Sequence, residues 1–169
     1  YMFVEVALIQ KLILPLEHPP VAMAAVLAAL LVSSGFGSLL GQRFSMLERP
    51  SMLLALAFLV LLCAVSLPWL IDLVQPWPLP YRGAFFCLLT ALPGTFMGIP
   101  FPAGLRLLGR TAPGLIPWAW SINGTVSVLA PLLAIMTAMA IGFRGVFLIG
   151  AAAYFLASLL LGRELRRSG

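Results

Sequence analysis

The chain has 169 residues, of which 62% are hydrophobic and only 9% are charged. A chain of this composition would not stay dissolved in water, so it is predicted to be an integral membrane protein rather than a soluble domain. Its formal net charge of +5 is explained by membrane topology and anionic lipid. The basic character therefore gives no reason to expect a nucleic-acid partner.

Charge-free runs divide the chain into membrane spans, each of which needs roughly 20 apolar residues. Five such runs are clear, and an apolar N-terminal segment supplies a sixth. The sequence thus predicts an all-α polytopic transmembrane helical bundle, with residues 1–169 forming one domain. The six predicted spans cover approximately residues 1–16, 19–42, 51–74, 82–109, 114–141 and 143–163. The chain lacks an initiator Met and the features of a signal peptide, so we expect a fragment or processed product of a longer protein.

The first predicted span carries polar residues at membrane depth. Glu5 precedes Glu17 by twelve residues, which places it roughly 18 Å below the outer helix end, near the bilayer centre. An ionisable residue there is a candidate proton or amine site, with Gln10 as a polar neighbour. The alternative is a protonated or hydrogen-bonded glutamate that locks helices together. Lys11, nearer the outer end, is expected to snorkel to the interface.

The second span contains the sequence GFGSLLG over residues 35–41, which superficially resembles a phosphate-binding loop. The glycines lie inside an apolar run long enough to be a membrane helix, and their spacing differs from the dinucleotide fingerprint. On a helix, Ser33, Gly37 and Gly41 recur every four residues and form one narrow stripe. Such a stripe lets another helix approach closely, so we predict helix packing and no phosphate site.

The basic residues sort to two sides of the predicted bundle. Lys11, Arg82 and Arg144 fall on one side. Seven others fall on the opposite side: Arg43, Arg49, Arg106, Arg110, Arg163, Arg166 and Arg167. Because cytoplasmic loops are rich in arginine and lysine, the larger group marks the cytoplasm. With six spans, both termini of this multi-pass protein would be cytoplasmic, and the expected location is the bacterial inner membrane.

Prolines interrupt the fourth and fifth predicted spans. Each removes an amide donor and bends its helix, so kinks are expected at Pro93, Pro100, Pro102 and Pro131. Broken helices persist at membrane depth where neighbouring protein or a cavity satisfies the freed carbonyls. Residues 91–104 are therefore the expected place for a cavity or a tight helix crossing.

The fifth span also carries a run of small polar side chains. Ser121 and Thr125 lie one turn apart on one face, and Asn123 lies between them in the sequence. Such groups can hydrogen-bond across helices or line a substrate path. The structural role is favoured over a substrate path, because hydroxyls on helices often bond their own backbone.

Residues for other chemistry are scarce. His18, the only histidine, stands beside two prolines and is expected to be a turn residue. Cys63 and Cys87 are single thiols in apolar runs and are expected to pack as small hydrophobes. The five acidic residues are dispersed, so no carboxylate pair is available for acid–base work. No catalytic residue, metal site or cofactor is predicted.

Two families share features with this sequence. The glycines that run into GQRF, residues 41–44, resemble the loop between the second and third helices in each half of a major facilitator transporter. The acidic residue of that loop has no counterpart, since Gln42 precedes Arg43. The segments GIPFPAGLRLL (98–108) and IPWAWSINGTVSVLAPLLA (116–134) are similar to the membrane segment of bacterial spermidine synthase-like fusion proteins. That resemblance covers residues 2–161 and implies a fold like half of a facilitator.

The resemblance implies a non-catalytic membrane domain. It would anchor a spermidine synthase-like protein and handle an amine or another small cation, and any aminopropyl transfer would lie in a fused soluble domain absent from this chain. One alternative is an accessory subunit packed within a larger membrane complex. Another is half of a transporter, with Glu5, Asn123 and the kinked fourth span around a path.

Overall fold

The computed structural model describes the backbone of residues 1–43 and 50–168, and the side chains of residues 1–42 and 51–163. All regular elements in these ranges are helical, which confirms the all-α prediction. They are α1 (Met2–Ile13), α2 (Pro19–Arg43), α3 (Pro50–Val74), α4 (Leu79–Met97), α5 (Pro100–Thr111), a 3-10 turn (Pro113–Leu115) and α6 (Ile116–Ser168). The predicted roles of Arg43, Arg49, Arg166 and Arg167 depend on side chains outside the described ones.

The helix ends follow the proline positions. Pro19, Pro50 and Pro100 each stand at the first position of a helix, where the missing amide would have had no partner within the helix. Between α4 and α5 the chain bends at Gly98 and Ile99, because Pro100 and Pro102 cannot donate to the preceding turn. The predicted span 82–109 is thus two helices. Pro93 and Pro131, expected at kinks, lie inside α4 and α6.

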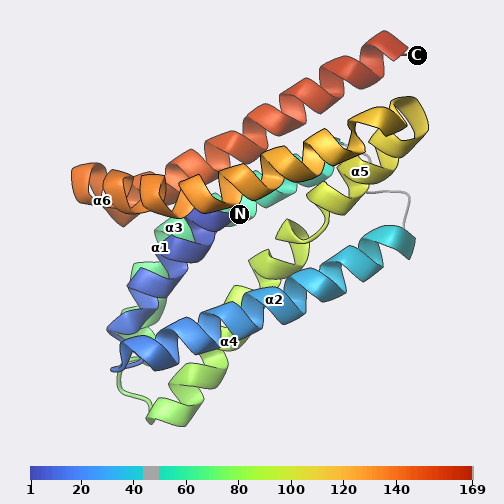
Figure 1. Cartoon of the computed structure of the whole chain (residues 1–169). Helices are drawn as coiled ribbons and strands as arrows, with labels where there is room; N and C mark the ends of the chain where they lie inside the picture. The colour runs from blue at the N-terminus through green and yellow to red at the C-terminus, as the bar shows by residue number, and fades with distance from the viewer. Residues whose placement is uncertain (44–49, 169) are drawn as a thin grey trace.

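Helix α6 reverses direction at Gly142. This residue has φ 77° and ψ 170°, a conformation that a residue with a Cβ rarely adopts. The arms before and after it run antiparallel, drawn in orange and red (Figure 1). At 1.5 Å per residue, the arm over 116–141 is about 39 Å long, enough to cross the roughly 30 Å of hydrocarbon by itself.

The prediction of six spans is wrong for the described residues. Four segments are long and apolar enough to cross a membrane: Pro19–Gln42, Ser51–Val74, Leu79–Thr111 and Pro113–Arg163. The fifth and sixth predicted spans are both part of α6. Helix α1 has 12 residues and is about 18 Å long, which is too short to cross. It begins beside the first arm of α6, within the bundle and away from the predicted cytoplasmic end (Figure 1).

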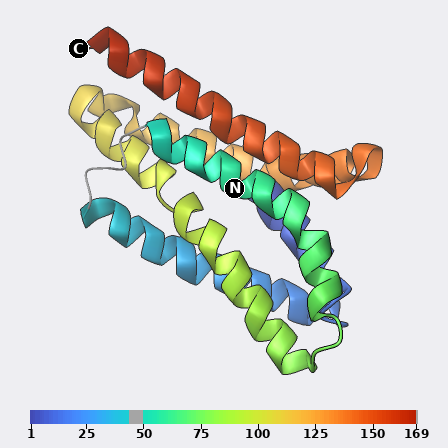
Figure 2. The same cartoon turned by 180° about the vertical axis from the view of Figure 1, so that it is seen from behind.

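The helices form two groups that α1 connects. Helix α2 packs mainly against α4, while α6 packs mainly against α3 and α1. Figure 2 shows the same division from behind, with α3 against α6 on one side and α4 beside α2 on the other. Helix α1 contributes Val4, Leu8 and Leu12 to a continuous core that includes residues of both groups. Burial of α1 between the groups therefore holds them together.

The connections gather at two opposite ends of the bundle. The α1–α2 corner, the α3–α4 loop and the reversal of α6 lie at one end (Figure 1). The ends of α2 and α5 and the C-terminal end of α6 lie at the other. Lys11, which lies over the ring of Phe143 at 5.8 Å, belongs to the first end. The long helices therefore run from one end of the bundle to the other, as membrane-spanning helices do.

The contact between α2 and α4 is made by small residues. Ser33, Gly37 and Gly41, the predicted packing stripe, are all buried. A Cβ added at Gly37 would overlap the backbone carbonyl of Thr95 in α4, whereas one added at Gly35 would meet no atom within 4 Å. The two backbones thus touch at Gly37, and this approach gives α2 and α4 their van der Waals contact.

We expect Gly37→Ala to destabilise the protein by about 1–3 kcal/mol, because the added methyl forces the two backbones apart. Gly35→Ala is the matched control on the same helix, since its methyl would enter open space. Thermal unfolding in mild detergent, followed by circular dichroism, measures both. Equal midpoints for the two variants would contradict the close approach of α2 to α4.

Candidate functional site

Two adjoining cavities lie between α6 and the rest of the bundle. The larger, which we call the α6 cavity, has a volume of ≈ 500 Å³. The smaller, the α4–α5 cavity, has a volume of ≈ 410 Å³. They share the lining residues Tyr1, Met2, Asn123 and Ser127. Both volumes are in the range that small-molecule sites occupy.

The α6 cavity is walled by both arms of α6 and the start of α1. Its apolar wall includes Val126, Leu129, Leu133 and Ile149. Asn123, Leu129 and Leu133 are exposed on the outer surface of the protein, so the cavity opens sideways. The opening therefore lies on the outer surface of the helical bundle.

The α4–α5 cavity lies where α4 breaks and α5 begins. Its wall includes Met97, Gly98, Phe101 and Pro102 from this break, together with the hydroxyl-bearing residues Ser34 and Ser38 of α2. The expectation of a cavity or tight crossing within residues 91–104 agrees with this position. The proline-induced break pulls the chain away from the straight path of a helix and leaves the space.

Residues from two separate segments of the chain, 98–108 and 116–134, meet at the α4–α5 cavity. Gly98, Phe101 and Pro102 come from the segment over 98–108, and Asn123 and Ser127 come from the segment over 116–134. Next to the cavity, the ring of Phe101 packs edge-on against Trp120, with centroids 5.0 Å apart. Residues about 20 positions apart in the sequence thereby form one wall.

Of the three candidate polar residues on α6, Asn123 lines the cavities, whereas Ser121 and Thr125 do not. Ser121 and Thr125 are exposed, and their hydroxyls donate to the backbone carbonyls of Pro117 at 3.0 Å and Ser121 at 2.9 Å. Their hydrogen bonds are therefore internal to the helix, in agreement with the backbone-bonding alternative. Ser127 lines both cavities, and its hydroxyl donates to the carbonyl of Asn123 at 2.7 Å.

The side-chain amide of Asn123 has no hydrogen-bond partner among the described residues, although its backbone carbonyl is bonded. It lies about 10 Å along α6 from Ile116, and its side chain is exposed at the cavity opening. Where lipid surrounds a helix, an amide without a hydrogen-bond partner is disfavoured. The cavity is the space from which a partner for this amide can come.

The polar residues predicted on α1 lie elsewhere. Glu5 is half-buried, and it is absent from the lining of both cavities. Gln10 is exposed and borders a smaller cavity of ≈ 210 Å³ near Phe143. The structure thus does not bring Glu5, Gln10 and Asn123 to one site. The described helices also offer no group of three metal-binding side chains.

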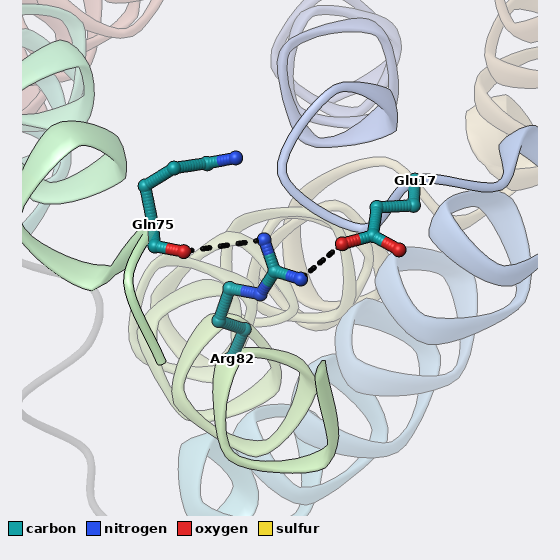
Figure 3. A network of polar contacts seen from close by, with 3 residues as sticks. All are labelled: Glu17, Gln75 and Arg82. Carbon is teal, nitrogen blue, oxygen red and sulfur yellow. Dashed lines mark hydrogen bonds and ion pairs between the residues drawn. The ribbon is translucent and has the colours of Figure 1, made fainter. Parts of the chain in front are cut away.

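A buried arginine forms a second polar site, at the end of the bundle that carries the α1–α2 corner and the α3–α4 loop. The Arg82 side chain is 7% exposed and forms an ion pair with Glu17 at the α1–α2 corner. It also donates to the backbone carbonyl of Gln75, at the end of α3, with a distance of 3.4 Å (Figure 3). Arg82 therefore links two connections that are distant in sequence, the α1–α2 corner and the α3–α4 loop.

The geometry around Arg82 carries strain and one unsatisfied donor. Glu17 has φ 65°, a left-handed conformation that costs a non-glycine residue about 1 kcal/mol or more. Within the described structure the Nε of Arg82 is buried without a hydrogen-bond partner. The sequence analysis assigned Arg82 to the outer side but missed this pair, because nothing in the sequence relates residues 65 positions apart.

Comparison with known proteins finds no family model, no curated protein and no solved structure that matches this chain.

We expect Glu17→Gln to lower the free energy of unfolding by about 1–3 kcal/mol, because a buried guanidinium loses its charged acceptor. Asp72→Asn, at an exposed position near the end of α3, removes a carboxylate of the same charge and is the matched control. Chemical or thermal unfolding in detergent measures the difference. Similar losses from both substitutions would show that the Arg82 pair adds no stability.

Proposed function

We propose that this chain is the membrane-embedded domain of a spermidine synthase-like protein and that it anchors a soluble domain to the bacterial inner membrane. The observation that carries the anchoring role is the distribution of apolar surface. Large hydrophobic side chains are exposed along α2, α3 and α6, for example Phe36, Phe58 and Leu133. Water disfavours so much apolar surface, whereas lipid accepts it. The link to a synthase is supported by the sequence segments that line the α4–α5 cavity.

The proposed topology has five crossings. Helices α2 and α3 cross once each, α4 and α5 cross together, and the two arms of α6 cross separately around Gly142. The C-terminal end then lies in the cytoplasm with Arg106, Arg110 and Arg163, as the excess of basic residues at that end supports. Helix α1 runs from inside the bundle to the α1–α2 corner at the outer end.

An amine-binding role would need an acidic group on the ligand path. Neither the α6 cavity nor the α4–α5 cavity has an acidic or basic residue in its lining. A desolvated ammonium in such a space would be strongly disfavoured. The proposed function is therefore anchoring, and the amine-handling role implied by the family resemblance is not carried into it.

Cysteine accessibility tests the topology. In a background with Cys63 and Cys87 replaced by alanine, we expect a membrane-impermeant maleimide to label Trp77→Cys and Arg144→Cys in intact spheroplasts. Gly114→Cys should be labelled only after lysis, because the α5–α6 junction lies on the cytoplasmic side. Labelling of Arg144→Cys only after lysis would contradict separate crossings by the two arms of α6.

An activity assay tests the link to a synthase. The chain is captured from its native membrane in mild detergent, and the captured material is incubated with decarboxylated S-adenosylmethionine and a diamine. We expect aminopropyl transfer in the captured material, carried out by the soluble domain that the chain anchors. Stable capture with no transfer above that of a mock capture would overturn this link while leaving the topology unaffected.

A further inference from the structure

We infer that the α6 cavity binds an uncharged, single-chain amphiphile that enters from the bilayer and hydrogen-bonds Asn123. This inference rests on the membrane embedding proposed above and goes beyond the anchoring role. The cavity, with a volume of ≈ 500 Å³, is large enough for a small molecule, and it opens toward the lipid-facing surface.

The charge of the ligand follows from the lining. The residues around the α6 cavity include no aspartate, glutamate, histidine, lysine or arginine. A charged group that left the headgroup layer for this space would lose its hydration and gain no side-chain counterion from this lining. An uncharged polar group loses much less on the same transfer and recovers it through one or two hydrogen bonds.

The position of the polar group follows from Asn123. Its amide has both donor and acceptor capacity and no partner among the described residues. The phenol of Tyr154, on the second arm, contributes another polar group to the same cavity. A hydroxyl or carbonyl on the ligand would supply the hydrogen-bond partner that this amide lacks.

The shape of the ligand follows from the direction of the apolar wall. From Asn123 the lining continues through Val126 and Leu129 to Leu133, ten residues and about 15 Å along α6 toward the outer end. A molecule with its polar group at Asn123 thus has its apolar chain directed toward the bilayer centre. Lipids of the cytoplasmic leaflet have this same orientation, so such a ligand can enter sideways without turning over.

Photolabelling in nanodiscs tests the inference. The full chain is reconstituted with a diazirine analogue of oleyl alcohol, irradiated and digested, and the labelled peptides are identified by mass spectrometry. We expect labels to concentrate within residues 126–133 and 149–157, above the level on the lipid-facing surface of α3. Asn123→Leu should reduce this labelling about fivefold, the effect of losing roughly one hydrogen bond. Ser121→Ala, which alters an exposed hydroxyl bonded to its own helix, should leave it unchanged.

Competition determines the class of ligand. Unlabelled oleyl alcohol should suppress the labelling, whereas oleylamine, which has the same chain with a cationic head at neutral pH, should not. Equal competition by the two, or labelling that is uniform and insensitive to Asn123→Leu, would overturn the inference. A wild-type chain that fails to incorporate into nanodiscs would instead contradict the membrane embedding, so the two failures are distinguishable.

Discussion

The requirement that every backbone amide and carbonyl be paired dominates this structure. In hydrocarbon no water is available for unpaired groups, so a chain of this composition has to cross as helices. Each helix continues until a residue cannot be accommodated in it, so the breaks identify the residues that interrupt helical structure. They occur at Pro100 and Pro102, where two amide donors are missing, and at Gly142, where a positive φ reverses the chain.

These interruptions also determine where the molecule has space. The break between α4 and α5 displaces the chain and forms one wall of the α4–α5 cavity. The reversal at Gly142 brings the two arms of α6 together around the α6 cavity. Asn123 and Ser127 border both spaces, and the side-chain amide of Asn123 has no hydrogen-bond partner among the described residues. At the α2–α4 contact, by contrast, small residues let the two helices pack closely together.

Much of the helical framework could be predicted because apolar runs and prolines are local signals. The predicted spans 19–42 and 51–74 agree closely with α2 and α3. The number of spans was wrong for the described residues because the last two predicted runs belong to one helix, α6, and because α1 has only 12 residues. Among the predicted kink positions, Pro93 lies inside α4, and the break between α4 and α5 occurs just before Pro100.

The polar site was less predictable. Ser121, Asn123 and Thr125 look alike in sequence. The hydroxyls of Ser121 and Thr125, however, donate to backbone carbonyls of their own helix. The packing of α6 against α1 determines that Asn123 borders the cavities. The pairing of Arg82 with Glu17 likewise depends on the folded arrangement of the α1–α2 corner and the α3–α4 loop.

The most direct test of the account is the depth profile of α6 in a bilayer. Nitroxide labels placed one at a time at positions 124, 132, 140, 148 and 156 are measured in nanodiscs by their collisions with oxygen and with a water-soluble nickel complex. The account predicts high oxygen accessibility at 132 and 156, with a peak of nickel accessibility between them near the reversal at Gly142. A profile with uniformly high oxygen accessibility from 124 through 156 would contradict two separate crossings and the cavity they enclose.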